Sequence, residues 1–164
     1  MHTLGFLVIY LSLLVGLMLL ILPLPGWLQL YRPDWIALIL IYWSMALPER
    51  VGLWSAFVVG LLVDSLQGAL LGQHALALTV IVYFNLKVYL LIRALSLPQQ
   101  ALYVFGLLII SQLITAWVDG IIGLSVPLQA FFAAPFIGML MWPGVYVVLR
   151  TVQRKVMPVG TQHE

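Results

Sequence analysis

Long apolar runs alternate with short polar breaks along the chain, and this pattern predicts helices that cross a membrane. Five stretches carry no Lys, Arg, Asp or Glu: residues 3–31, 51–63, 65–86, 94–118 and 120–149. Several of them exceed the roughly 18 apolar residues that mark a spanning helix. Because the runs are continuous rather than alternating, helices are favoured over a closed barrel.

Prolines, glycines and charges divide the apolar runs into six predicted spans. The first ends at Pro23 and Pro25, and it lacks the basic segment and small-residue cleavage site of a signal peptide. The second has only about 15 residues, which is short for an apolar core of about 30 Å and implies local thinning or burial among neighbours. The other five are predicted at residues 33–47, 51–71, 75–92, 99–118 and 136–150.

Turn and cap residues mark the ends of these spans. Pro33 and Asp34 are suited to begin the second span, and residues 48–50 to form a tight hairpin after it. Residues 119–135 are apolar but interrupted by glycine and proline, so we expect an outer loop or a re-entrant segment there. We expect one transmembrane domain at residues 1–155 and a short cytoplasmic tail at 156–164.

The composition supports this all-α integral membrane class. Hydrophobic residues make up 64% of the chain and charged residues 7%, with a mean hydropathy of +1.15. The absence of cysteine excludes disulfides, thiolate metal sites and cysteine nucleophiles. A net charge of +2 is too small to indicate a nucleic-acid partner, whereas the lipid bilayer is an expected one.

The distribution of basic residues predicts the orientation. In a six-span arrangement Arg32 falls alone on one side of the membrane, and the other side is rich in cations. Because cytoplasmic loops carry the excess of Lys and Arg, both termini are predicted to be cytoplasmic. The cations on that side are Arg50, Lys87, Arg93, Arg150, Arg154 and Lys155.

The stretch "LLVDSLQGALLG" contains Asp64, one of only five acidic residues. Gly60, Asp64, Gly68 and Gly72 recur every four residues, which predicts a stripe of small residues that another helix can approach closely. An ionised Asp at this depth costs about 2.5–3.5 kcal/mol unless it finds water or a donor. We therefore expect Asp64 to face protein or an outer cavity, with Arg32 or backbone amides as partners. The alternative is a frayed span end, with the carboxylate in water.

The predicted topology also places three charged residues at the outer side of the membrane. Arg32, Asp34 and Asp119 are candidates for contacts with a partner at the outer surface. No comparable set of residues indicates a cofactor, and none is expected.

Catalytic and metal-binding interpretations are weak. Ser65, His74 and Asp64 could be imagined as a hydrolytic trio, but no elbow motif such as G-x-S-x-G presents Ser65. His74 and Asp64 are only two ligands, fewer than the three or four that a metal site needs. A histidine at the end of a loop is the simpler interpretation, and we expect no enzymatic activity.

The stretch "YRPDWIALILIYWSMALPERVGLWSAFVVGLLVDSLQGALLGQHALALTVIVYF" resembles the rod shape-determining protein MreD family. The shared features are an R-P-D/N-W entry, an L-P-x-R-V turn and a G-x-x-x-D-x-x-x-G-x-x-x-G spacing. The resemblance implies a non-enzymatic inner-membrane scaffold of the bacterial cell-elongation complex. Its implied partner is MreC, with MreB, the RodA glycosyltransferase and a penicillin-binding transpeptidase as indirect partners in peptidoglycan synthesis.

The same resemblance carries an alternative. The MreD family is similar in fold to the substrate-binding S components of energy-coupling vitamin importers, which implies a small-molecule-binding transport subunit as the second hypothesis. The spans offer such a pocket few polar groups: Asp64, Gln67, Gln73, His74, Asn85 and Gln112.

Overall fold

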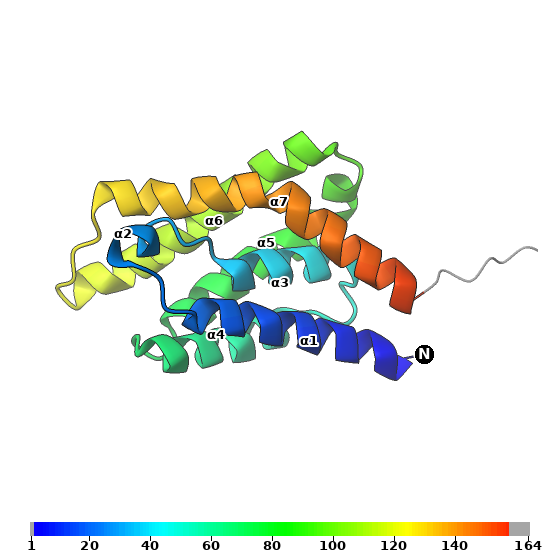
Figure 1. The fold of residues 1–164 in the computed structure, drawn as a ribbon, viewed down its shortest axis with the longest axis horizontal. Coiled ribbons are helices and arrows are strands. Elements are labelled where there is room, and N and C mark those ends of the chain that lie inside the picture. The colour runs from blue at the N-terminus through cyan, green and yellow to red at the C-terminus, as the bar shows by residue number, and fades with distance from the viewer. Residues whose placement is uncertain (1, 158–164) are drawn as a thin grey trace, which may run out of the picture.

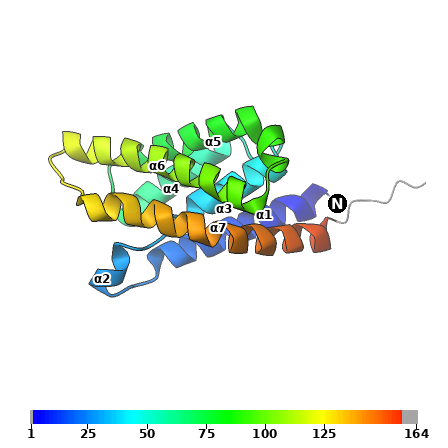
Figure 2. The same cartoon turned by 90° about the horizontal axis from the view of Figure 1, so that it is seen from above.

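The computed structural model describes residues 2–157, and the regular structure within that range is helical (Figure 1). Six long helices run alternately in opposite directions along one bundle, and a short seventh, α2, lies in the connection between α1 and α3 (Figures 1 and 2). The helices are α1 (His2–Ile21), α2 (Gly26–Gln29), α3 (Trp35–Ala46), α4 (Leu53–Gln67), α5 (Gln73–Arg93), α6 (Leu97–Ile121) and α7 (Leu128–Val156).

Four of the helices, α1, α5, α6 and α7, are long and apolar enough to cross a membrane. The other two long elements are apolar but shorter, with 12 residues in α3 and 15 in α4. The all-helical prediction is therefore confirmed. Of the six predicted spans, four reach spanning length.

Helix α3 is the centre of the bundle. All ten residues from Ile36 to Met45 are buried, and the helix packs against α1, α5, α6 and α7. A helix that is apolar all round buries its whole surface rather than one face. With 12 residues at 1.5 Å each, α3 is about 18 Å long. The burial expected for this short span is confirmed, since its neighbours enclose it.

Polar side chains fasten this central helix to its neighbours. Trp43 donates its indole N–H to the Ser12 hydroxyl of α1 at 2.8 Å. From α5, the Asn85 amide donates to the Ile41 carbonyl at 2.9 Å and to the Ser44 hydroxyl at 2.7 Å. Because each donor has an acceptor in an apolar interior, these bonds fix the relative registers of α1, α3 and α5.

Helix α3 begins at Trp35, so Pro33 lies before the helix and not at its first position as predicted, whereas the predicted turn after the helix is present. Asp34 is the N-cap and accepts the Ala37 N–H at 3.0 Å. After the helix, the N–H groups of Arg50 and Val51 donate to the Leu47 carbonyl, which forms the predicted hairpin turn. A carboxylate at a helix N-terminus is favoured by the unpaired N–H groups and by the helix dipole.

The expected loop at residues 119–135 is wrong in its bounds. Helix α6 continues to Ile121 and α7 already begins at Leu128, so the connection is confined to residues 122–127. Pro135 and Pro143 both lie inside α7, and Pro135 is buried. Proline usually breaks a helix, and the sequence prediction relied on that rule. In a bundle of membrane helices, neighbouring helices can stabilise a helix that contains proline.

Both ends of the described chain lie at the same end of the bundle (Figures 1 and 2). Helix α7 extends to Val156, so it takes in the beginning of the tail that was expected at 156–164. The rest of that tail, from residue 158 onward, lies outside the described residues.

Candidate functional site

The Asp64 carboxylate lies completely buried where α4 turns into α5. One oxygen, Oδ1, accepts the backbone N–H of His74 at 2.9 Å, and Nδ1 of the same residue lies 2.8 Å from it. The other oxygen, Oδ2, accepts the N–H of Gly72 at 2.9 Å and that of Ala75 at 3.4 Å. We call this set of four residues, Asp64, Gly72, His74 and Ala75, the Asp64 cap.

In the Asp64 cap, the side chain of Asp64 on α4 caps the N-terminus of the neighbouring helix α5. Gly72 is the N-cap residue of α5 and has no side chain to offer. The first N–H groups of a helix have no partner within the helix, and a carboxylate there is further favoured by the helix dipole. Both oxygens of Asp64 are engaged, so the carboxylate has a structural role in holding the α4–α5 turn.

This geometry decides between the two predicted partners of Asp64. Backbone amides hold the carboxylate, as expected, whereas Arg32 lies elsewhere and its guanidinium donates to the Leu20 and Leu22 carbonyls. These carbonyls are at the end of α1, where a cation is favoured by the helix dipole. The frayed-end alternative is wrong, because the carboxylate has no solvent-exposed surface.

The four-residue stripe is wrong as a description of one helix face. Helix α4 ends at Gln67, and Gly68 and Gly72 adopt positive φ angles of 64° and 102° in the turn that follows. These left-handed conformations suit glycine because it has no Cβ. A spacing of four therefore spans a helix, a tight turn and the start of the next helix.

Gly60 does permit a close helix contact, but the contact is within the chain. A Cβ atom at this position would overlap the backbone of Ala75 on α5. Helices α4 and α5 form the most extensive helix pair of the bundle. Gly60 is buried and is not available to a partner protein.

The two acidic residues predicted at the outer surface, Asp34 and Asp119, also make internal contacts at the same end of the bundle. Asp34 caps α3, because its carboxylate accepts the Ala37 N–H. Asp119 accepts the Gln73 amide at 2.8 Å, which ties the start of α5 to the end of α6. Both carboxyl groups are only partly exposed.

The imagined hydrolytic trio is not assembled. The Ser65 hydroxyl donates to the Leu61 carbonyl of its own helix at 2.9 Å, whereas His74 contacts Asp64. Within residues 2–157, no group of three or more His, Cys, Asp or Glu side chains is arranged to hold a metal ion.

Comparison with known proteins identifies the family of the chain. A profile of the MreD family, described as rod shape-determining protein MreD, matches residues 1–152. The chain is also 34% identical over 134 residues to the rod shape-determining protein MreD of Haemophilus influenzae, which covers 82% of this chain and 83% of the relative. The chain belongs to the MreD family. No solved structure matches it.

Membership in the MreD family confirms the resemblance that residues 31–84 carried and extends it over α1 to α6 and most of α7. Both the profile and the relative are described as rod shape-determining, and nothing in the comparisons supports the importer alternative. In this MreD-family chain, the Asp64 cap and Gly60 make contacts within the chain itself and support its fold.

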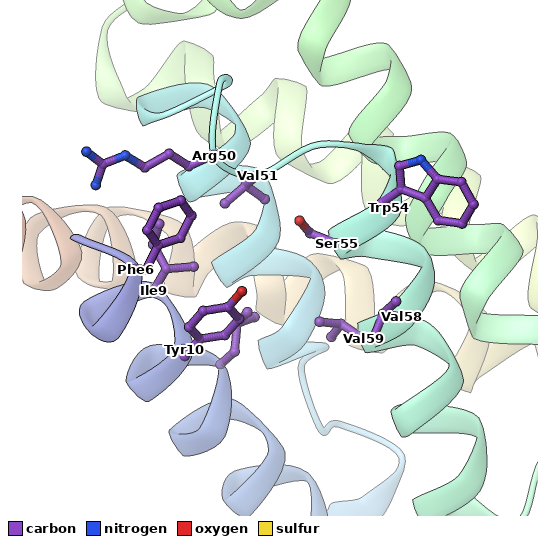
Figure 3. Close-up of a pocket in the computed structure, with 10 residues that line it drawn as sticks. Phe6, Ile9, Tyr10, Arg50, Val51, Trp54, Ser55, Val58 and Val59 are labelled. Carbon is purple, nitrogen blue, oxygen red and sulfur yellow. The ribbon is translucent and has the colours of Figure 1, made fainter. Parts of the chain in front are cut away.

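An open groove lies between α1 and α4 on the surface of this MreD-family fold (Figure 3). Its volume is about 260 Å³; Phe6 and Tyr10 line one wall, and Trp54 and Val58 line the other. Arg50 lies at one end of it, with its guanidinium carbon 5.2 Å from the centre of the Phe6 ring. Helices α1 and α4 have few direct contacts, so this face of the bundle is open to the surroundings.

The sequence analysis of this MreD-family chain missed the hydrogen bonds of two glutamines, Gln100 and Gln153. Buried Gln100 donates to the Ile92 and Leu95 carbonyls, and Trp142 donates to its side-chain oxygen at 3.4 Å. Tyr42 donates to Gln153, a residue 111 positions away. An amide in an apolar run signals such bonding, but the sequence does not reveal its partner.

Proposed function

We propose that this MreD-family chain helps to determine cell shape as a non-enzymatic scaffold in the inner membrane of a rod-shaped bacterium. It would bind MreC and, through it, act with MreB, RodA and a penicillin-binding transpeptidase to position peptidoglycan synthesis. The single observation that carries the proposal is the match of residues 1–152 to the rod shape-determining family.

The architecture supports a scaffold that works within the bilayer. Most described residues belong to helices, and the connections between them are short. Many large apolar side chains on the helix surfaces are exposed, for example Leu14 at 52%, Leu113 at 54% and Leu140 at 59%. In a membrane these faces meet lipid or the spans of other proteins.

We further propose that all six long helices cross the membrane, with both termini in the cytoplasm. The alternating directions of the helices and the shared location of the two chain ends support this topology (Figure 2). The six cations that the sequence assigns to the cytoplasm contrast with Arg32 alone on the other side. Because α3 is enclosed by protein, its length need not match the thickness of the lipid core.

The predicted contact residues divide into two groups under this proposal. Gly60 and Asp64 are buried and support the fold. Gly68 is exposed and Gly72 is half-exposed at the outer turn, and Arg32, Asp34 and Asp119 are partly exposed at the same end of the bundle. We propose this outer end as the surface on which the outer domain of an MreC-like partner rests.

Depletion tests the proposal. Cells that lose this protein should change from rods to spheres, and the unaltered chain expressed in its place should restore rods. A matched variant is Leu71→Glu, which adds a charge at an exposed position of the outer turn whose backbone does not require glycine. We expect normal amounts of this variant in the membrane with weaker shape restoration, and unchanged rods after depletion would refute the proposed role.

A further inference from the structure

A basic cavity lies at the end of the bundle where α3, α5 and α7 end. Its volume is about 380 Å³, and Tyr42, Arg93, Tyr146, Arg150 and Gln153 line most of it. A second polar cavity of about 330 Å³ adjoins it, because Arg93 lines both. Arg50 lies on the wall of this second cavity, so three guanidinium groups follow one another along the same end of the bundle.

Among the described residues, no ion pair neutralises the cations at this end of the bundle. Among residues 2–157 the only ion pair joins His74 and Asp64, which lie at the opposite end. Glu49 lines the second cavity but forms no ion pair with Arg50 or Arg93 there. Within residues 2–157, the guanidinium groups of Arg93 and Arg150 therefore have no ion-pair partner.

The donors of the cavity are held in place by the fold. The Arg93 guanidinium donates through Nε to the Met45 carbonyl at 2.8 Å and through Nη2 to the Ala46 carbonyl at 2.5 Å. Its central carbon also lies 5.2 Å from the centre of the Tyr89 ring. Such contacts fix a long side chain without neutralising its charge.

The other side of the cavity is similarly organised. Arg150 donates to the Tyr146 hydroxyl at 3.3 Å, and its guanidinium lies over the Tyr146 ring at 5.5 Å. Tyr42 donates to the side-chain oxygen of Gln153 at 2.7 Å. This bond occupies one of the two lone pairs of the Gln153 amide oxygen, and the amide's two N–H donors add to those of the two arginines that line the cavity.

We propose that this cavity binds a phosphate group, carried by the headgroup of an anionic phospholipid. A phosphate offers several oxygen acceptors and negative charge, and the guanidinium fork of arginine matches it in geometry. The position favours lipid as the source. Val147 and Val148, just before Arg150, are 53% and 61% exposed, so acyl chains can lie along the helix beneath the bound headgroup.

The proposal goes beyond the scaffold function and does not depend on it. Its assignment to the cytoplasmic leaflet rests on the proposed topology, but the phosphate chemistry does not. Anionic lipids in that leaflet attract basic residues at the ends of spans. Loss of lipid binding with rods unchanged would leave the scaffold proposal standing, so the two can fail separately.

The test measures lipid binding to the purified full-length protein in detergent by native mass spectrometry. Phosphatidylglycerol should bind at least tenfold more tightly than phosphatidylcholine, whose headgroup has no net charge. Arg150→Gln should weaken phosphatidylglycerol binding about tenfold, the effect expected for loss of one charge-assisted hydrogen bond. The matched control Lys155→Gln removes an equal charge from an exposed position on the same helix and should change binding less than twofold.

Arg150→Gln is expected to fold, since the bond it loses lies within one helix. Arg150→Lys, which keeps the charge, should retain part of the affinity. Competition with glycerol 3-phosphate distinguishes a phospholipid from a soluble phosphate compound as the ligand. If millimolar glycerol 3-phosphate does not displace the lipid, the site is a lipid site. If it displaces the lipid fully, the lipid assignment is wrong and the ligand is a soluble phosphate compound. Equal binding of the two phospholipids, or equal effects of Arg150→Gln and Lys155→Gln, would overturn the proposal.

Discussion

The side chain of Asp64 at the end of α4 accepts a 2.9 Å hydrogen bond from the backbone N–H of Gly72, eight residues later. The bond closes the turn between the antiparallel helices α4 and α5, and the Asp64 side chain is fully buried there. A residue that looks like an interaction site in the sequence is therefore a structural element of the fold.

Replacement of Asp64 should destabilise the protein. Asp64→Leu leaves the partly buried N–H groups of Gly72 and His74 without their acceptor, at a cost of at most about 1–3 kcal/mol for each group. Asp64→Asn keeps the shape and one acceptor oxygen, so it should lose less. Thermal unfolding in detergent measures the difference, and an unchanged melting temperature for Asp64→Leu would contradict the role of the Asp64 cap.

Gly60 should be intolerant of even one added methyl group. The Cβ of Gly60→Ala would overlap the backbone of Ala75, which cannot move aside as a side chain does. We expect a loss of about 1–3 kcal/mol, as for other overpacked positions. Gly106→Ala is the matched control, because a Cβ there meets no atom within 4 Å and the substitution should stabilise α6 by about 0.5–1 kcal/mol. Equal stability of the two variants would show that the α4–α5 contact is looser than described.

The topology proposal predicts the activity of reporter fusions. Alkaline phosphatase, which is active outside the cytoplasm, should be active when fused after Leu71 or Leu124 and inactive after Arg50 or Ser96. These positions lie in the connections at the two opposite ends of the bundle. Activity of the fusion after Ser96 would be incompatible with six spans and cytoplasmic termini.

The strongest local signals in the sequence predicted the fold best. The long apolar runs predicted the helices, and the position of Asp34 at the start of α3 and the turn at residues 48–50 matched the structure, although Pro33 lies before the helix. Pro135 misled the prediction at the start of α7, because packing against neighbouring helices can override a local helix-breaking residue.

The candidate site was harder to predict because its meaning depends on contacts across the chain. A four-residue spacing from Gly60 to Gly72 fits a helix face, and only the positive φ angles reveal that the chain turns within it. Arg93 ends α5, yet its guanidinium donates to carbonyls at the end of α3. No local pattern records such a contact.

Affinity purification of the tagged full-length protein from native membranes tests the central claim most directly. The scaffold account predicts that MreC is recovered with it, and that Gly60→Ala, if destabilised, reduces recovery in proportion to the amount of folded protein. Recovery of an ATPase-bearing transport module in place of MreC would contradict the account.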